Sequence, residues 1–74
     1  MEKFFEGLAE VFELETAEVT PELSLSTIAW DSLAIVSTIA LIDEHFDVMV
    51  DGQALASCET VADIQRLITS AKQA

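Results

Sequence analysis

Residues 30–46 read WDSLAIVSTIALIDEHF, and this stretch decides the fold that the sequence predicts. An acidic residue, Asp31, stands directly before Ser32, and the segment then becomes almost wholly apolar. Because aspartate is a favoured N-cap, the pattern predicts a helix over 32–46 with Ser32 as its first residue. Asp43 and Glu44 come late in this helix, where the helix dipole does not favour negative charge.

Two adjacent apolar stripes run along the predicted helix. The first, called here the Ile35 stripe, has spacings of four, three and four residues and consists of Ile35, Ile39, Ile42 and Phe46. The second, the Leu33 stripe, consists of Leu33, Val36 and Ala40. Together they form more apolar surface than one core-facing side of a helix needs.

Upstream of this stretch, the sequence predicts one helix and a long loop. Apolar residues recur at helical spacing over 3–14, with acids on the opposite side, which is typical of an amphipathic helix. Residues 15–30 are mixed, and Thr20-Pro21 argues against a continuous helix because the residue before proline avoids the helical region. Apolar residues should anchor this loop to the core: Leu23, Leu25 and Ile28.

Downstream, the sequence predicts a connector over 47–58 and a last helix over 61–71. We expect a short helical turn near Gln53–Ala56. The alternation over 46–50 resembles that of a strand, but the sequence offers no second strand to pair with it, so this segment is read as part of the connector. Thr60 and Asp63 form a variant capping box at the start of the last helix. Its inner face consists of Val61, Ile64, Leu67 and Ile68. These elements predict an all-α bundle of three long helices and one short helix, in a single domain over 1–74.

Composition limits the classes of partner. The net charge is −11, so nucleic acid and anionic membrane surfaces would be repelled, and partners should present basic patches. No segment approaches the ~20 apolar residues that span a bilayer, and the charged, periodic start does not resemble a secretory leader. The only cysteine is Cys58, which favours a reducing compartment, so we expect a cytoplasmic monomer without disulfides.

Ser32 is the residue with the most distinctive chemical setting. At the N-terminus of a helix it meets unpaired N–H groups and the positive end of the dipole, which favour a phosphate ester. A prosthetic arm at Ser32 would lie beside the apolar surface that begins at Leu33. A serine hydrolase is disfavoured, because His45, the only histidine, is about 20 Å away along the same helix. The alternative is that Ser32 only helps to start the helix.

The segment Trp30-Asp31-Ser32-Leu33 resembles the Asp-Ser-Leu signature of acyl carrier proteins. The resemblance extends over essentially the whole chain, from the acidic first helix and long loop to the Ile/Val-rich second helix and Thr60-Val61 at the last helix. It implies a four-helix bundle that carries 4′-phosphopantetheine covalently on Ser32, attached by a phosphopantetheinyl transferase of the holo-acyl-carrier-protein synthase type. Acyl groups would then be carried as thioesters on the arm, and the carrier itself would perform no catalysis.

The resemblance also implies roles for neighbouring residues. Asp31 would assist the transferase step beside Ser32, with Leu33 completing the signature. The Ile35 stripe would face the interior and line an acyl pocket. Partner enzymes, which activate, condense or transfer acyl groups through basic surfaces, would contact a face formed by Leu33, Val36, Ala40, Asp43 and Glu44.

One departure from the family pattern suggests a specialised carrier. Family members often have acids just after the signature leucine and again three residues later, where this chain has Ala34 and Ser37. The negative charge lies further along instead, at Asp43, Glu44, Asp47 and Asp51. Specialised fatty acid or polyketide biosynthesis is therefore favoured over housekeeping lipid metabolism. Two alternatives remain: an aminoacyl or peptidyl carrier of the same fold, and an unmodified acidic module for protein interaction.

Three further side chains have expected roles. Trp30 packs on the edge of the bundle, or else shields the base of the arm or contacts the transferase. His45 caps the helix or lies at the surface, and Cys58 is a small buried hydrophobe. The acids Asp43, Asp47 and Asp51 form a solvated face, since they lack the order of a calcium loop.

Overall fold

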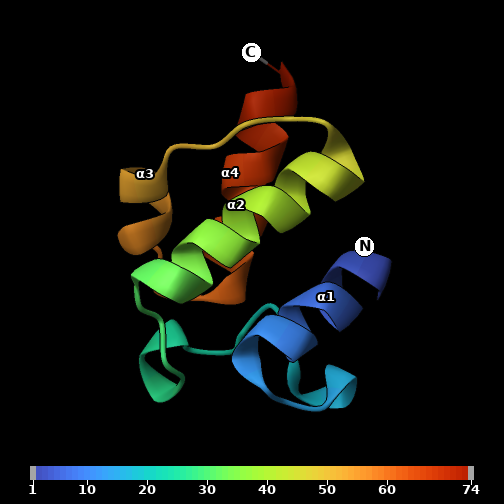
Figure 1. Ribbon diagram of the computed structural model, residues 1–74, viewed down its shortest axis with the longest axis vertical. Helices are drawn as coiled ribbons and strands as arrows, with labels where there is room; N and C mark the ends of the chain where they lie inside the picture. Colours follow the sequence, from blue (N-terminus) through green and yellow to red (C-terminus); the bar gives the residue numbers. More distant parts are fainter. Residues whose placement is uncertain (1, 74) are drawn as a thin grey trace.

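The computed structural model describes residues 2–73 (Figure 1). This part of the chain contains four α-helices and two short 3₁₀ turns, joined by loops. The long helices are α1 (Glu2–Phe12), α2 (Ser32–Phe46) and α4 (Val61–Gln73), and the short helix is α3 (Gly52–Ala56). The turns η1 (Thr16–Glu18) and η2 (Leu25–Thr27) lie in the first loop, which joins α1 to α2. The predicted all-α bundle, including the short helix near Gln53–Ala56, is confirmed. The strand suggested by residues 46–50 is absent from the described structure.

Helix α2 is central, because it contacts each of the other three helices. In Figure 1 it runs diagonally across the molecule, with α1 below it and α3 beside its N-terminal half. The side chain of Asp31 accepts a hydrogen bond from the Ala34 N–H at 3.0 Å, so the predicted N-cap is confirmed and Ser32 is the first helical residue.

Helix α1 ends two residues earlier than the apolar pattern predicts. Glu13 adopts a left-handed conformation with φ of 60°, which ends the helix at Phe12. The N–H of Leu14 then bonds to the carbonyl of Ala9 at 2.9 Å, and the N–H of Glu13 to that of Glu10 at 3.3 Å. This bonding pattern is the Schellman motif, which satisfies the last carbonyls of a helix. Because a left-handed residue here is a glutamate and not a glycine, the sequence contains no direct signal for the end.

Helix α2 also ends at a left-handed residue that is not glycine. Asp47 has φ of 57°, and its N–H bonds to the carbonyl of Asp43 at 2.9 Å. A left-handed conformation is costly for residues with a Cβ, and the negative charge of Asp47 stands at the negative end of the helix dipole. Both effects make Asp47 an unfavourable residue at this position.

Replacing Asp47 by glycine should therefore stabilise the fold by about 1 kcal/mol, since glycine adopts the left-handed conformation without penalty and removes the charge. The urea midpoint of unfolding measures this change. Asp51→Gly is a suitable control, because Asp51 has φ of −76° and its carboxylate caps α3 by accepting from the Gln53 N–H at 3.2 Å. It removes the same charge and should destabilise the protein. A lower midpoint for Asp47→Gly would contradict the argument.

The core is formed by all four helices and the first loop. Its fully buried large side chains come from every element except the 3₁₀ turn η1: Phe4, Leu8, Leu25, Ile42, Leu55, Val61, Ile64 and Ile68. Of the aromatic residues of α1, Phe4 and Phe12 are buried, whereas Phe5 is half-buried. Of the inner face predicted for α4, only Leu67 is half-buried and the rest is fully buried. Helix α4 continues to Gln73, two residues beyond the prediction.

The Ile35 stripe faces the interior as expected, but only Ile42 is fully buried, and the other members pack against the core from its edge. The buried residues of this helix are Ala34, Thr38 and Ile42, and the other three members of the stripe are half-buried. Thr38 is fully buried because its hydroxyl donates to the carbonyl of Ala34 at 2.8 Å, which removes the cost of burying a polar group.

Helices α1 and α2 are in tight contact at Gly7. A Cβ added to Gly7 would lie only 2.6 Å from Cδ1 of Leu41 on α2. Glycine lowers the intrinsic stability of a helix, but at this position it permits the close packing of α1 and α2.

The first loop is fixed to the start of α4 by main-chain hydrogen bonds. The carbonyls of Pro21 and Leu23 accept from the N–H groups of Ala62 and Val61, at 2.9 and 3.1 Å. The N–H of Leu25 donates in return to the carbonyl of Glu59 at 2.8 Å. These bonds satisfy N–H groups that every helix N-terminus leaves without an intrahelical partner. The loop therefore serves as part of the cap of α4.

The predicted capping box at Asp63 is also confirmed. The Asp63 carboxylate accepts from the N–H groups of Glu59 and Thr60 at 3.0 and 3.2 Å, and the Thr60 hydroxyl accepts from the Asp63 N–H at 3.4 Å. Arg66 forms an ion pair with the same carboxylate at 2.8 Å. The Glu59 N–H, followed by that of Thr60, lowers the pKa of Asp63 below its ordinary value.

This lowered pKa predicts a pH dependence of stability. A carboxyl whose pKa is lower in the folded state stabilises the protein above its unfolded pKa, and this contribution is lost as the pH falls through the folded value. We expect the free energy of unfolding of the wild type to fall below about pH 4, and this fall to be smaller in Asp63→Asn. Urea unfolding between neutral and acid pH measures both. Equal pH dependence in the two proteins would contradict the prediction.

Candidate functional site at the start of helix α2

Ser32 lies at the exposed N-terminus of α2, as its sequence setting predicts. Asp31, which is also exposed, caps the helix through Ala34, so the hydroxyl of Ser32 is not needed as the cap. The positive end of the α2 dipole lies beside this hydroxyl and favours an attached phosphate. The hydroxyl is therefore accessible to a modifying enzyme and placed where a phosphate ester is stable.

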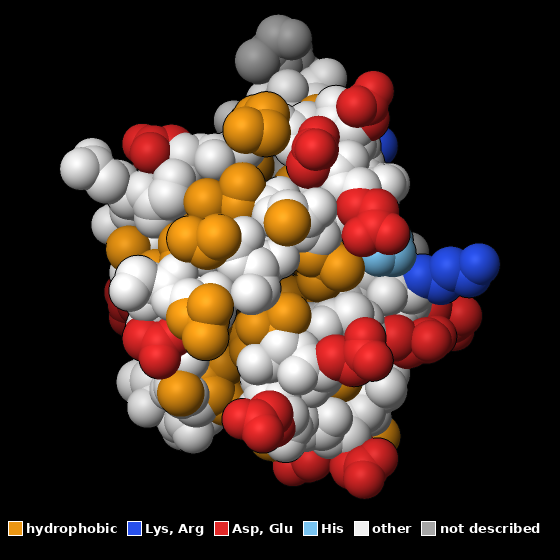
Figure 2. Space-filling model, viewed as in Figure 1, with side chains coloured by type: hydrophobic (Ala, Val, Ile, Leu, Met, Phe, Trp, Pro, Cys, Tyr) orange, Lys and Arg blue, Asp and Glu red, His pale blue; other side chains and the backbone are white. Residues whose placement is uncertain are grey.

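The Leu33 stripe is exposed to solvent along α2. Leu33 and Val36 are 76% and 61% exposed, and Ala40 is exposed as well. Large apolar side chains this exposed and grouped mark contact surfaces. Figure 2 shows hydrophobic side chains gathered over α2 and the loop after it, with acidic side chains around them. The predicted acids Asp43 and Glu44 are both exposed.

Met49 extends this apolar surface and was missed by the sequence analysis. It lies between α2 and α3 and is 73% exposed. The sequence signal for an exposed Met49 was the alternating apolar pattern over 46–50, because this segment had no second strand to pair with. Val48 and Val50 turn partly inward, whereas Met49 between them points outward.

Trp30 ties the residues before Ser32 to the bundle. Its indole N–H donates to the carbonyl of Leu55 in α3 at 3.1 Å. Its ring packs edge-on against Phe12 of α1, with 5.9 Å between ring centroids and an interplanar angle of 80°. The expected packing on the edge of the bundle is confirmed. Trp30 therefore fixes the position of Asp31 and Ser32 relative to α1 and α3.

His45 lies too far from Ser32 to act as its catalytic base. His45 is exposed near the C-terminal end of α2, thirteen residues after Ser32, and its ring packs edge-on against Phe4. That separation is about 20 Å along a helix, far beyond the hydrogen-bond distance that a serine nucleophile needs from its base. Among the described residues, no group of three or more His, Cys, Asp or Glu side chains could hold a metal ion.

Cys58 is half-buried, and not fully buried as expected. Its thiol donates to the carbonyl of Ala54 at 3.5 Å. Burial, and secondarily the negative charge of Asp63, raise the pKa of the Cys58 thiol above its ordinary value, against a smaller opposite effect of Arg66. The thiol is therefore protonated at neutral pH and weakly nucleophilic.

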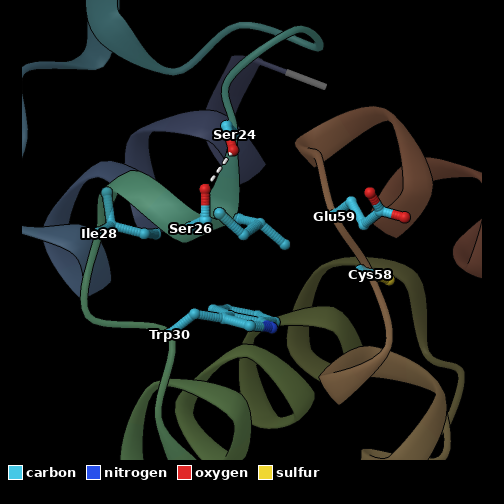
Figure 3. Close-up of a pocket in the computed structure, with 7 residues that line it drawn as sticks. Ser24, Ser26, Ile28, Trp30, Cys58 and Glu59 are labelled. Atoms are coloured by element: carbon cyan, nitrogen blue, oxygen red, sulfur yellow. Dashed lines mark hydrogen bonds between the residues drawn. The ribbon is translucent and has the colours of Figure 1, made fainter.

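Two cavities lie near the ends of α3. The first has a volume of about 330 Å³ and lies between the first loop and the α3–α4 connector (Figure 3), lined by Ser24, Leu25, Ser26, Ile28, Trp30, Cys58 and Glu59. The second, of about 240 Å³, is lined by Met49, Val50, Asp51, Ala54, Leu67, Ser70 and Ala71. Neither is lined by the Ile35 stripe, which was expected to line an acyl pocket.

Comparison with known proteins identifies the class of the chain. The family model described as the phosphopantetheine attachment site matches residues 2–68. The comparison with curated proteins found no significant match. The described residues fit the group that this family carries, since an exposed serine hydroxyl lies at the positive end of a long helix beside an apolar surface. No helix in residues 2–73 is long and apolar enough to cross a membrane. The chain belongs to the phosphopantetheine attachment site family, and it is a carrier of covalently bound 4′-phosphopantetheine and not an enzyme.

Proposed function

We propose that Ser32 is the attachment residue and that the protein carries acyl intermediates for a specialised biosynthetic pathway. The observation that carries this proposal is the exposed hydroxyl of Ser32 at the first residue of α2, next to the Asp31 cap. The bound arm supplies a terminal thiol, on which acyl groups are held as thioesters. The chain positions the arm, and other enzymes perform the chemistry.

A carrier of this family is served by a phosphopantetheinyl transferase and by acyl-processing enzymes. We propose that these enzymes contact the Leu33 stripe, whose exposure supports this role, together with Asp43 and Glu44. The net charge of −11 supports partners with basic surfaces. A monomer in the cytoplasm remains our proposal for the state and location of the chain, supported by its single, half-buried cysteine.

The distribution of charge near Ser32 supports a specialised carrier. Ala34 is 7% exposed and Ser37 is half-buried, so this part of α2 presents little charge to a partner. Slow turnover by a standard ketoacyl synthase is the expected result. Near-normal turnover would contradict specialisation without affecting the assignment of Ser32.

Co-expression with a broad-specificity phosphopantetheinyl transferase tests the proposal directly. We expect the intact mass of the chain to increase by one phosphopantetheine. No increase with an active transferase would favour the unmodified interaction module, which family membership already disfavours. Loading assays with acyl-activating and amino-acid-activating enzymes then separate the acyl carrier from the aminoacyl or peptidyl carrier. The mass of the group recovered as a thioester from the native cell names the cargo.

Docking should depend on salt concentration. If acids such as Asp43 and Glu44 steer a basic partner, the association rate with the transferase should fall several-fold between low and physiological ionic strength, because screening weakens long-range attraction. Stopped-flow measurements over a salt series give this rate. An association rate that does not change with salt would assign the contact to the Leu33 stripe alone.

A further inference from the structure

The larger cavity is built from segments that are far apart in the chain. Figure 3 shows Trp30 on one side of it and Ser24 and Ser26 on another, with Cys58 and Glu59 contributed by the α3–α4 connector. The hydroxyls of Ser24 and Ser26 lie 2.8 Å apart and form a hydrogen bond. Leu25, which is 1% exposed, closes the cavity toward the core.

The cavity lies close to Ser32. Trp30 is two residues before Ser32, so their Cα atoms are separated by at most about 7 Å. The hydrogen bond from the Trp30 indole to Leu55 holds this wall against α3. In Figure 1 the start of α2, the turn η2 and the end of α3 lie near one another. The phosphopantetheine arm, which contains two amide linkages between phosphate and thiol, is longer than this separation.

We propose that this cavity receives the distal end of the arm together with a short acyl group that bears no negative charge. The inference rests on the proposed attachment at Ser32 and adds the place and class of the cargo. The Ile35 stripe lines neither of the two cavities described above.

The size and lining of the cavity determine this class of cargo. A volume of about 330 Å³ is near the lower end of the range for small-molecule sites, so it holds a short group and not a long alkyl chain. The serine hydroxyls offer hydrogen bonds to amide and carbonyl groups, and Leu25, Ile28 and Trp30 offer apolar contact. Glu59 is the only charged lining residue, and no Lys or Arg lines the cavity, so a carboxylate on the cargo would be repelled.

The second cavity is an alternative site for the arm. It is smaller, and its lining is contributed by α3, α4 and the residues between α2 and α3. None of its lining residues comes from the first loop, which carries Trp30 toward Ser32. Ser70, which is exposed, lies in this second cavity and gives a matched probe for it.

A disulfide between the arm and an introduced cysteine locates the arm. In a Cys58→Ser background, Ser26→Cys places a thiol in the first cavity and Ser70→Cys places one in the second. Each chain is first loaded with the arm, and its gain in mass is recorded. Diamide then takes one hydrogen from each of the two thiols, the S–S bond forms, and the mass falls by two hydrogens.

We expect Ser26→Cys to form this bond at least about tenfold faster than Ser70→Cys, because a tethered thiol has a high effective concentration only where it can reach. Equal rates, or a faster reaction at Ser70→Cys, would overturn the assignment of the cavity. A chain that gains the arm but fails this comparison leaves the proposed function intact. A chain that gains no arm overturns both.

The fluorescence of Trp30 tests the class of cargo on an otherwise unmodified chain, since Trp30 is the only tryptophan. The holo protein is loaded with acetyl, β-alanyl, malonyl or hexadecanoyl groups. We expect acetyl and β-alanyl to shift the emission maximum relative to the unloaded arm, and malonyl and hexadecanoyl to leave it unchanged. A larger shift of the emission maximum with β-alanyl than with acetyl would assign an aminoacyl cargo. A larger shift with acetyl would assign an uncharged acyl cargo.

Filling the cavity provides the control. Ser26→Phe, at an exposed lining position, should remove the shift, whereas Ser70→Phe should keep it. A malonyl or hexadecanoyl shift as large as that of acetyl would overturn the proposed class. A shift that persists in Ser26→Phe would overturn the proposed site.

Discussion

Replacing Ser32 by alanine should abolish the mass gain that a phosphopantetheinyl transferase produces on this chain. The arm is attached through a phosphate ester to a hydroxyl, and Ser32 is the first residue of a long helix. The Thr60 hydroxyl, before the first residue of α4, is instead engaged with the Asp63 N–H. The nearest serine on the same helix, Ser37, is half-buried in its second turn. Intact mass spectrometry after co-expression with an active transferase gives the result, with the wild type as reference.

Ser37→Ala is the matched control, because it removes a hydroxyl from the same helix and should leave the modification complete. The free energy of unfolding of Ser32→Ala should also lie within about 0.5 kcal/mol of the wild-type value, since Ser32 is exposed and Asp31 supplies the cap. Loss of modification would then report the missing hydroxyl and not a damaged fold. Residual modification of Ser32→Ala would place the arm on another residue.

Truncating Ile42 to alanine should destabilise the fold by roughly 2–5 kcal/mol, the range for removing a large aliphatic side chain from a core. Ile42 is 0% exposed and lies in the C-terminal half of α2, the helix that contacts the other three. Small domains have total stabilities of about 5–15 kcal/mol, and this one has only 74 residues, so the loss is a large part of the total. Urea unfolding followed by circular dichroism measures the change.

Val36→Ala, on the same helix, separates burial from hydrophobicity. Val36 is 61% exposed, so its truncation should change stability by no more than about 0.5 kcal/mol. It should nevertheless weaken docking of the transferase if the Leu33 stripe is the contact surface. Similar losses of stability in Ile42→Ala and Val36→Ala would show that α2 is packed differently from the arrangement described here.

The start of α2 was predicted correctly because strong local signals mark its N-terminus. A capping aspartate and a continuous apolar run define the start at Ser32, and both operate within one turn of the chain. The end of α1 was misplaced because Glu13 adopts a left-handed conformation that its residue type does not favour. That conformation is imposed by the path of the chain into the first loop, which no local pattern encodes.

The site was predicted in part for the same reason. Ser32 and the exposed Leu33 stripe follow from the periodicity of one helix, whereas the inner face of α2 depends on three neighbouring helices that meet it from different directions. This is why Ala34 and Thr38 are buried in place of Ile35 and Ile39. The first cavity combines residues from segments 30 positions apart, such as Ile28 and Cys58, and only the folded chain brings them together.

The hydrogen bonds from Ala62 and Val61 to Pro21 and Leu23 have a consequence for engineering hybrid carriers. A chimera that exchanges the first loop alone, to alter partner choice near Ser32, would leave the opening amides of the last helix without acceptors wherever the new loop follows a different path, because the acceptors are main-chain carbonyls. Segments 20–25 and 59–63 therefore form one transplantable module, although more than thirty residues separate them in the chain. Recombination designs that move both segments together should yield folded hybrids more often than designs that move either one.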